Sequence, residues 1–340
     1  MKKTGEKMRF KIAILIVMFS ASPVFAGVGE GAIDLLKVPA GAKTQSLGGA
    51  YTAVSDDLEA FDVNPAGLAN INGNEILFIH DMYLDGIFYD SLYYAYGTGD
   101  SGTFSAAFKF LNGGTIVQTT ETSGGMYGGE GEEVSAINFL GALGYGINMG
   151  KMMYNDFTKN INAGAVLKFS GESIGPDYSN MAVSLDLGAT YAIILEEADF
   201  MSNRGETIWN KIGLGFAVRN LGTSFEAGIT PMTLAVGAYT QILNLFNSTN
   251  RMRISMDFDY SIADSINIRG GIEHMQMLGE INFSVRAGGN FSPEERLAGG
   301  FAVGAGFGMN AGSMKYSLDY VFMPFSAFGS SQKIGLYIRF

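Results

Sequence analysis

Apolar and polar residues alternate strictly along several stretches in the second half of the chain. The clearest stretch is residues 251–260, where every even-numbered residue is apolar or aromatic and every odd-numbered residue is polar or charged. Alternation over so many residues is typical of a β-strand with one apolar and one polar face. The same pattern recurs at residues 281–288, 314–322 and 333–340. These stretches are therefore predicted to be β-strands of one repeated kind.

The length and the composition of these stretches favour a sheet in a membrane. They are about ten residues long, which suits a tilted membrane strand, whereas strands of about five to six residues are common in soluble sheets. Their apolar faces carry many aromatic side chains, and their polar faces carry glycine and charges of both signs. A sheet in lipid must close, because each unpaired backbone group costs several kcal/mol there. We therefore predict an all-β fold, a transmembrane antiparallel β-barrel.

Residues 1–26 are predicted to be a signal peptide that is cleaved after Ala26. Five basic residues precede a short apolar stretch at residues 12–19, and Val24 and Ala26 occupy the −3 and −1 positions of the predicted cleavage site. This stretch is too short to span about 30 Å of hydrocarbon as a helix. No later stretch approaches about eighteen uninterrupted apolar residues. The outer membrane of a diderm bacterium is thus the expected location, with outer-membrane lipid and the barrel-insertion machinery as partners.

Fourteen stretches qualify as strands, an even number that places both ends of the barrel domain on the periplasmic side. The connection at residues 112–133 is predicted to be a mobile external loop, and the long, charged connection at 196–207 does not fit the pattern of short periplasmic turns. Phe340 ends the last strand and resembles the terminal signal that the barrel-insertion machinery reads. The predicted strands are residues 75–84, 87–97, 102–111, 134–149, 160–171, 181–195, 208–220, 232–243, 252–260, 265–275, 280–291, 297–309, 313–323 and 332–340.

Charge and residue types exclude several other functions. The chain has 22 basic and 33 acidic residues, and without residues 1–26 its formal net charge falls from −11 to −15, which argues against nucleic acid as a partner. It has no cysteine, which excludes disulfides and thiolate sites. His80 and His274 each adjoin an acid, Asp81 and Glu273, but adjacent residues of a strand face opposite ways. We therefore expect neither enzyme activity nor a cofactor.

Residues 27–73 differ from the rest, because alternation is poor there. Asn64 and Pro65 form a turn signal, and Ser55 and Asp56 are candidates to cap a short helix. The segment contains three conspicuous motifs. These are Leu47-Gly48-Gly49-Ala50-Tyr51, then Asp56-Asp57, then Asn64-Pro65-Ala66-Gly67-Leu68.

These motifs resemble the N-terminal signature of the PorV/PorQ group, relatives of the FadL-type outer-membrane transporters for long-chain fatty acids. The resemblance covers about residues 38–71 and implies a hatch, residues 27–73, inside a barrel of about fourteen strands, residues 74–340. It also implies a hydrophobic small-molecule ligand in the lumen, a hatch that moves, and a side opening in the wall. Members of the PorV/PorQ branch also serve as partners of a protein secretion system. A structural or adhesive barrel is a third alternative, and the oligomeric state stays open.

Charged residues follow the predicted lumen faces of the last six strands. Seven are basic and four are acidic, whereas the hatch carries four acids within residues 56–62, so we expect an acidic hatch in a locally basic wall. The alternative is that wall charges pair with one another along neighbouring strands. Glycines on the lumen faces, such as Gly215 and Gly304, leave room in the barrel or allow close packing. The wall charges are Arg251, Arg253, Arg269, Arg286, Lys315, Lys333 and Arg339 with Asp257, Asp259, Glu273 and Asp319.

Overall fold

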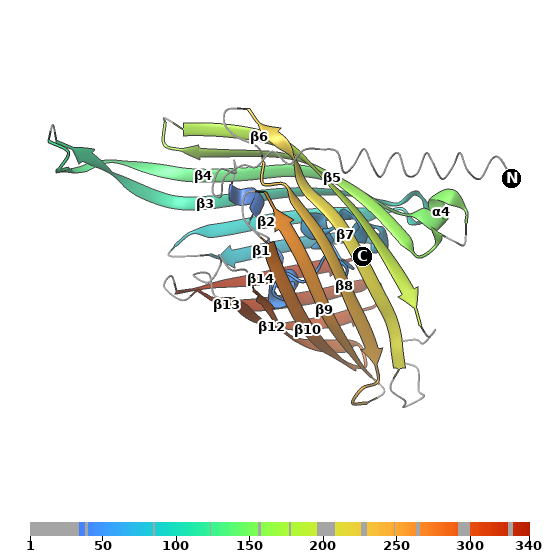
Figure 1. Ribbon diagram of the computed structural model, residues 1–340. Coiled ribbons are helices and arrows are strands. Elements are labelled where there is room, and N and C mark those ends of the chain that lie inside the picture. Colours follow the sequence, from blue (N-terminus) through green and yellow to red (C-terminus); the bar gives the residue numbers. More distant parts are fainter. Residues whose placement is uncertain are drawn as a thin grey trace, which may run out of the picture.

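Fourteen antiparallel strands form one closed barrel in the computed structural model (Figure 1), in which consecutive strands pair and β1 pairs with β14. This confirms the predicted fold class. None of the helices in the described part of the chain is long and apolar enough to cross a membrane. The structure describes residues 34–37, 40–83, 86–122, 124–155, 158–176, 178–195, 208–225, 230–247, 249–262, 266–291, 300–325 and 329–340.

The strands match the predicted stretches in number and order, and most bounds agree within a few residues. Ala26 and the connection at 196–207 lie outside the described residues. The strands are β1 (Gly73–Met82), β2 (Phe88–Gly97), β3 (Thr103–Glu121), β4 (Tyr127–Asn148), β5 (Ile161–Ile174), β6 (Tyr178–Ile194), β7 (Ile208–Ser224), β8 (Thr233–Leu243), β9 (Asn250–Ser261), β10 (Ile266–Leu278), β11 (Ile281–Asn290), β12 (Phe301–Ala311), β13 (Met314–Phe325) and β14 (Gly329–Arg339).

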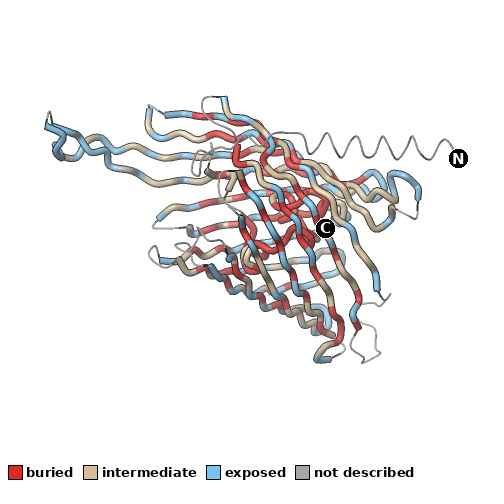
Figure 2. The backbone as a smooth tube through the Cα atoms, in the orientation of Figure 1, coloured by how far each residue is buried: buried red, intermediate tan, exposed pale blue. Residues whose placement is uncertain are grey.

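Most strands turn their apolar residues outward and their polar or small residues inward, as the alternation predicts, whereas β1 and β2 also turn large apolar and aromatic side chains inward. On β9, Met256 and Phe258 are 61% and 46% exposed on the outer surface, whereas Arg253 and Asp257 are 7% and 1% exposed. Figure 2 shows this alternation of buried and exposed positions along the strands. Outward apolar side chains suit contact with lipid, and inward polar ones suit a lumen.

The two ends of the barrel differ. The turn end carries the short connections after β10 and β12 together with the last residue, Phe340, and we expect it to face the periplasm. The opposite end, the ribbon end, carries the connection between β3 and β4. Here the prediction of a loop at 112–133 is wrong, because the two strands stay paired as far as Glu121 and Tyr127 and project from the barrel (Figure 1).

The N-terminal segment lies inside the barrel as a series of short helices and turns. Its helices are η1 (Asp34–Lys37), α2 (Ala42–Ser46), α3 (Ala60–Val63) and η2 (Pro65–Asn70); outside the lumen are η3 (Gly99–Ser101) and α4 (Met149–Met153). We call residues 40–72 the hatch. The predicted helix cap at Ser55 and Asp56 is wrong, because the Ser55 hydroxyl donates to the Tyr51 carbonyl and α3 begins only at Ala60.

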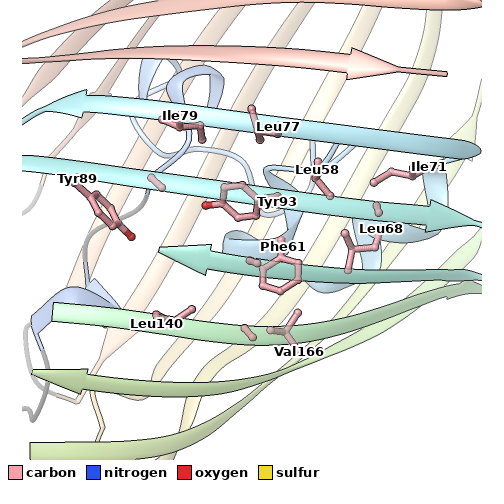
Figure 3. Close-up of a cluster of buried hydrophobic side chains, with 14 of the residues drawn as sticks. Leu58, Phe61, Leu68, Ile71, Leu77, Ile79, Tyr89, Tyr93, Leu140 and Val166 are labelled. Carbon is pink, nitrogen blue, oxygen red and sulfur yellow. The ribbon is translucent and has the colours of Figure 1, made fainter. Parts of the chain in front are cut away.

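Apolar side chains of the hatch pack against one part of the inner wall (Figure 3). Leu58, Phe61 and Leu68 are fully buried against residues from β1, β2, β4 and β5. The rings of Phe61 and Tyr93 meet edge to face, with centroids 5.8 Å apart. Burial of such side chains stabilises each by about 1.5–3 kcal/mol, so the hatch is an integral part of the folded barrel. The wall residues of this cluster include Leu77, Ile79, Tyr89, Tyr93, Leu140 and Val166.

Candidate functional site

Wall glycines seat the hatch backbone along more than half of the barrel. The hatch runs against successive strands in reverse order, with Ser46 on β12, Thr52 on β7 and β8, and Leu68 on β4. At each of these contacts a wall glycine faces the hatch, so both predicted lumen glycines, Gly215 and Gly304, serve close packing. We call this set the glycine belt. It comprises Gly144, Gly146, Gly164, Gly188, Gly215, Gly237, Gly271, Gly288 and Gly304.

The belt leaves no space for larger side chains. A methyl group at Gly288 would collide with the peptide that joins Leu47 to Gly48, and one at Gly164 would collide with the Pro65 carbonyl. Gly48 itself has a φ of 65° and packs on the backbone of Gly289, so the Gly-Gly pair of the motif is needed for close approach. The hatch is therefore fitted to the wall backbone to backbone.

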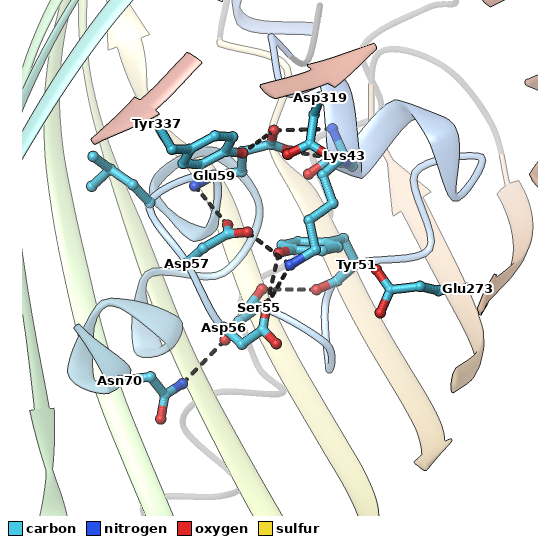
Figure 4. Close-up of polar contacts among 12 residues, drawn as sticks. Lys43, Tyr51, Ser55, Asp56, Asp57, Glu59, Asn70, Glu273, Asp319 and Tyr337 are labelled. Atoms are coloured by element: carbon cyan, nitrogen blue, oxygen red, sulfur yellow. Dashed lines mark hydrogen bonds and ion pairs between the residues drawn. The ribbon is translucent and has the colours of Figure 1, made fainter. Parts of the chain in front are cut away.

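A second set of contacts joins the hatch to β9 through charges. The Lys43 ammonium lies 2.7 Å from an Asp56 oxygen and 2.8 Å from an Asp57 oxygen, and Arg253 of β9 lies 2.6 Å from the other Asp56 oxygen. Figure 4 shows the hatch side chains turned toward one another around Lys43. Burial raises the pKa of Asp56, but Arg253 and Lys43 outweigh it and hold that pKa well below its usual range. Asp56 therefore stays ionised and ties the hatch to the wall.

The same charges continue along the wall. Glu273 of β10 accepts from Arg251 at 3.0 Å and from Arg286 of β11 at 2.8 Å, and Arg286 also lies 2.5 Å from Asp319 of β13. We call Lys43, Asp56, Asp57, Arg253, Glu273, Arg286 and Asp319 the charge cluster. Wall charges thus pair across neighbouring strands, and Asp56 of the hatch joins them through Arg253.

Glu59 holds the start of the hatch from a fully buried position. Its carboxylate accepts from the Lys43 amide at 3.0 Å and the Thr44 amide at 2.7 Å, and it also accepts from the Tyr337 hydroxyl of β14. Burial, followed by the neighbouring Asp57 charge, raises the pKa of Glu59 to about 7 in spite of these hydrogen bonds. The protonation of this one group therefore changes near neutral pH.

Two more acids join the hatch to the wall at other points. Asp62 of the hatch accepts from Lys109 of β3 at 2.5 Å and from the Tyr93 hydroxyl at 2.6 Å. Burial raises the pKa of Asp62, but the Lys109 charge outweighs it, so the carboxylate has a lowered pKa. On β9, where the belt has no glycine, Asp257 accepts from the Thr52 amide at 2.7 Å. Hatch and wall therefore exchange hydrogen bonds in both directions.

Cavities lie on both sides of the hatch. The ribbon-end cavity measures about 530 Å³, and the turn-end cavity measures about 240 Å³. Lys43, Asp56 and Asp57 line the turn-end cavity, whereas Gly48, Gly49 and Asp62 line the ribbon-end cavity. The ribbon-end cavity is not continuously apolar. Among its lining residues are Leu35, Leu36, Leu140, Phe301, Met323 and Phe325, and also Lys37, Lys109, Lys168, Arg219, Asp259, Arg269 and Lys333.

The remaining predicted site residues take other places. Asp259 and Arg269 line the ribbon-end cavity, and Lys315 and Arg339 line the turn-end cavity, where Arg339 lies 2.5 Å from Glu75. Phe340 exchanges two backbone hydrogen bonds with Asn74, and its role in assembly stays a prediction. In the last motif, the Asn64 amide donates to the Thr52 carbonyl at 2.7 Å, Pro65 and Ala66 rest on the belt, and Gly67 packs on Ser55.

Several buried charges of the lumen were missed from the sequence. Lys43 is the centre of the hatch ion pairs, and Lys109, Lys168 and Glu75 point into the lumen from β3, β5 and β1. Lys109 and Lys168 lie at the alternate positions of β3 and β5 that face the lumen. The alternation that predicted the wall charges of β9 to β14 would therefore have predicted these two lysines as well. From the sequence, His80 was considered only together with its neighbour Asp81. In the structure, a ring nitrogen of His80 lies 2.7 Å from an Asp90 oxygen on the outer surface. Asp81 instead pairs with Lys333 at 2.6 Å.

Comparison with known proteins matches the chain to one sequence family and to several solved barrel structures. The model of an uncharacterised protein family, UPF0164, matches residues 25–331. Two proteins of Treponema pallidum with that family name match at 22% identity over 190 residues and 33% over 85 residues. These alignments cover 55% and 24% of this chain and 54% and 22% of the relatives, so the chain spans about half the length of the first.

Two solved structures with a similar fold are toluene transporters. The toluene transporter TodX of Pseudomonas putida is similar over 93% of this chain and 98% of its own, with a TM-score of 0.53 and 13% identity. The toluene transporter TbuX of Ralstonia pickettii is similar over 92% of this chain and 99% of its own, with a TM-score of 0.50 and 12% identity. At such identities the likeness shows a shared barrel fold.

Proposed function

This chain belongs to the UPF0164 family, and we propose that it is an outer-membrane channel for hydrophobic small molecules, such as long-chain fatty acids, that is closed by its hatch. The observation that carries the proposal is the position of the hatch between a ribbon-end cavity of about 530 Å³ and a turn-end cavity of about 240 Å³. A barrel that only anchored a surface structure has no need for a separate cavity on each side of its plug.

Further support comes from the fold and from the cavity wall. The two toluene transporters named above have this fold, and apolar side chains such as Leu35, Met323 and Phe325 form part of the ribbon-end cavity. A volume of about 530 Å³ also falls in the range of about 300–1,000 Å³ that is usual for small-molecule pockets. Passage through the barrel then requires that at least part of the hatch move aside.

A reversible lock on the hatch tests this proposal. A Cβ atom at Gly335 of β14 would lie 3.5 Å from that of Ala42, which is close to the usual separation in a disulfide. Because the chain has no cysteine, Ala42→Cys with Gly335→Cys creates one defined bridge. We expect diderm cells that lack their own fatty-acid channel to take up labelled oleate when they make the reduced variant, and to lose this uptake when it is oxidised.

Each single-cysteine variant is the matched control, because it carries the same substitution without the bridge. Uptake by the controls should be equal before and after oxidation. If the oxidised double variant takes up oleate as fast as the reduced one, release of α2 from β14 is not needed for transport. If cells with the wild-type chain take up no more oleate than cells without it, the proposed substrate is wrong.

A second candidate function is that of a PorV-like partner in protein secretion, and one feature favours it. Among the described residues, β3 beyond Asn112 and β4 before Ser135 pair only with each other, so the projecting ribbon presents two open edges there. Its described side chains are mostly exposed, Met126 and Tyr127 by 72% and 68%. Unpaired edges are where another chain can add a strand. Shortening the ribbon should then reduce secretion and leave oleate uptake unchanged.

A further inference from the structure

The connection between β4 and β5 carries apolar side chains on its surface. It contains the short helix α4 at the turn end, where membrane barrels usually have short turns. Met149, Met152 and Met153 share one side of α4, because residues three and four apart lie on the same face of a helix. Met152 and Met153 are 59% and 57% exposed, and Tyr154 directly after the helix is 93% exposed. α4 thus has an apolar face that the described part of the chain leaves uncovered.

The rest of the molecule holds α4 by its polar side. The Asn148 side chain accepts from the amides of Gly150 and Lys151 at 3.1 Å and 3.3 Å, which caps the start of the helix. Lys151 lies on the side opposite the methionines, and its ammonium donates to the Gly99 carbonyl of η3 at 3.2 Å and lies 3.6 Å from Asp100. Figure 1 shows α4 beside the ends of β4 and β5. The apolar face therefore points away from η3.

Tyr154 ends the helix in a backbone conformation that is unusual for its type. Its φ of 49° and ψ of 43° lie in the left-handed region, where glycine is usual and a bulky residue is an outlier. Asn155, a type that adopts this conformation more readily, comes only one position later. The conformation leaves the Tyr154 side chain almost fully exposed. Strain of this kind at an exposed aromatic residue points to a role outside the fold itself.

The outer face of β4 leads to α4 without a polar residue. Every outward residue from Ile137 to Ile147 is apolar, aromatic or glycine. At about 3.3 Å per residue and a tilt of about 40°, this stretch rises by about 25 Å, the usual height of the apolar band of a membrane barrel. Near its lower end, the ring of Tyr145 packs on that of Phe104 with centroids 5.0 Å apart, as in an aromatic girdle. α4 begins just beyond Ile147, so it lies at the level of the lipid headgroups.

We propose that α4 is an interfacial anchor, which places Met149, Met152, Met153 and Tyr154 among the phospholipids of the periplasmic leaflet. Interfacial helices sink their apolar face into the boundary between headgroups and acyl chains and turn their polar face away from it. Tyrosine favours this boundary, because its ring is apolar and its hydroxyl group is polar. Lipid is the partner that fits, since the apolar face continues the lipid-facing surface of β4. The inference goes beyond the proposed function and does not depend on the solute.

Tryptophan emission in vesicles tests the anchor, because Trp209 is the only tryptophan of the chain. Trp209→Phe removes it, and Tyr154→Trp in that background places a single reporter directly after α4. The full chain is folded into phosphatidylcholine vesicles whose acyl chains carry bromine, which quenches indoles in contact with lipid. Trp209 of the wild type is the positive reference, since it is 56% exposed on the outer face of β7. We expect quenching at position 154 to be within about twofold of that at Trp209.

The matched control is Asp100→Trp in the same background. Its reporter lies in η3 on the polar side of α4, where the Asp100 side chain is 86% exposed. Loss of so exposed an ion pair with Lys151 leaves α4 in place. We expect this reporter to be quenched weakly by the brominated lipid and strongly by iodide in the water. Heat-modifiable migration on gels shows that each variant has formed the barrel.

A second pair of substitutions assigns the contact to the methionines. Met152→Ser with Met153→Ser should lower the lipid quenching at position 154 at least about twofold, because the apolar face is then lost. In a chain that keeps Trp209, the same two substitutions should leave the quenching of Trp209 unchanged, since the barrel stays at its depth. Unchanged quenching at position 154 would contradict the role of the methionines.

The result that would overturn the anchor is lipid quenching at position 154 as weak as that at position 100 in folded variants. A reporter at position 154 that is shielded from both lipid and iodide would overturn it as well. In that case a protein, such as a second copy of the chain, covers α4 instead of lipid. Strong lipid quenching at position 154 with weak quenching at position 100 supports the anchor.

Discussion

The glycine belt and the charge cluster hold the same hatch by different physical means. The belt is a backbone-to-backbone fit along β4 to β12, where any added atom would collide. The charge cluster joins Lys43, Asp56 and Asp57 to β9, β10, β11 and β13 through ion pairs. Close packing does not depend on salt or protonation, whereas paired charges depend on both. The contacts of the hatch with the glycine belt should therefore be insensitive to solution conditions, whereas its contacts through the charge cluster should weaken as salt or pH changes.

Removing the acids of the charge cluster should have the largest effect. In the variant Asp56→Asn with Asp57→Asn, Lys43 remains buried without its two partners. Loss of a partner from a buried ion pair costs about 3–5 kcal/mol, and we expect the lower end, since the Asp56 side chain is 29% exposed. Planar-bilayer conductance should rise, and a protease on the turn-end side should cut near Asn64.

The control for this variant is Asp100→Asn, which removes a surface acid that lies 3.6 Å from Lys151 and is 86% exposed. Its effect should stay below about 1 kcal/mol. Wild-type conductance and protease resistance in the double variant would mean that packing by Leu47, Tyr51 and Phe61, rather than charge, retains the hatch.

A methyl group in the glycine belt should have the next largest effect. Gly288→Ala places its Cβ against the Leu47–Gly48 peptide, and such overpacking costs about 1–3 kcal/mol. Gly141→Ala on β4 is the control, because a Cβ there has no neighbour within 4 Å. The loss of stability should appear as a lower temperature for the gel-shift transition of Gly288→Ala only, and it should be the same at low and high salt. A salt-dependent loss would contradict the division between the two regions.

The pH dependence of Glu59 should be the smallest effect. The pKa of Glu59 is raised to about 7 while the hatch is bound to the wall. In a released hatch the carboxyl group has its ordinary pKa, so the bound state holds a proton that the released state has lost. This contribution is fully present below the ordinary pKa of about 4.5 and is lost as pH rises through about 7. Between pH 6 and 7.5 the free energy that holds the hatch on the wall should fall by about 1 kcal/mol.

Thiol labelling measures this change, since the chain has no cysteine of its own. In an Ala53→Cys variant, the buried residue 53 should react faster with maleimide at pH 7.5 than at pH 6, after correction for the reactivity of a free thiol. Adding Glu59→Gln should abolish the difference. An equal pH dependence with and without Glu59 would assign the effect to another group.

Alternation along the strands predicted the barrel and the inward direction of the wall charges, but it was weak in β1 and β2, where both faces carry apolar or aromatic residues. It works because lipid and lumen impose opposite demands on successive side chains, as on Met256 and Asp257. The family resemblance carried by the motifs from Leu47 to Leu68 implied a segment inside the lumen, and the structure places residues 40–72 there. The partners of the hatch acids could not be predicted from the sequence. Asp57 and Glu59 bind Lys43 of the hatch and Tyr337 of β14, which lie far from them in the sequence.

The wrong and missing predictions also have physical causes. The ribbon between β3 and β4 has neither lipid nor a core beside it, so its polar sequence lacks the apolar face by which strands are recognised. β7 has a bulge at Arg219 and Asn220, opposite Asp186 of β6, and the bulge depends on hydrogen bonds of Asn220 with Asp186 and Lys168 from other strands. Lys43 was overlooked because a single lysine in an irregular segment gives no periodic signal.

The order in which the glycine belt meets the hatch has a consequence for how the molecule is made. Ser46 rests on Gly304, and the Thr52 amide binds Asp257, 205 residues further along the chain. The hatch is synthesised first, yet its seat exists only when β4 to β12 stand side by side. Contacts between such distant parts of a chain form slowly, because a large loop must close, at a cost in conformational entropy, before the contacts can stabilise the fold. The rate at which the barrel matures should thus be set by the docking of the hatch, which is made before the strands that bind it.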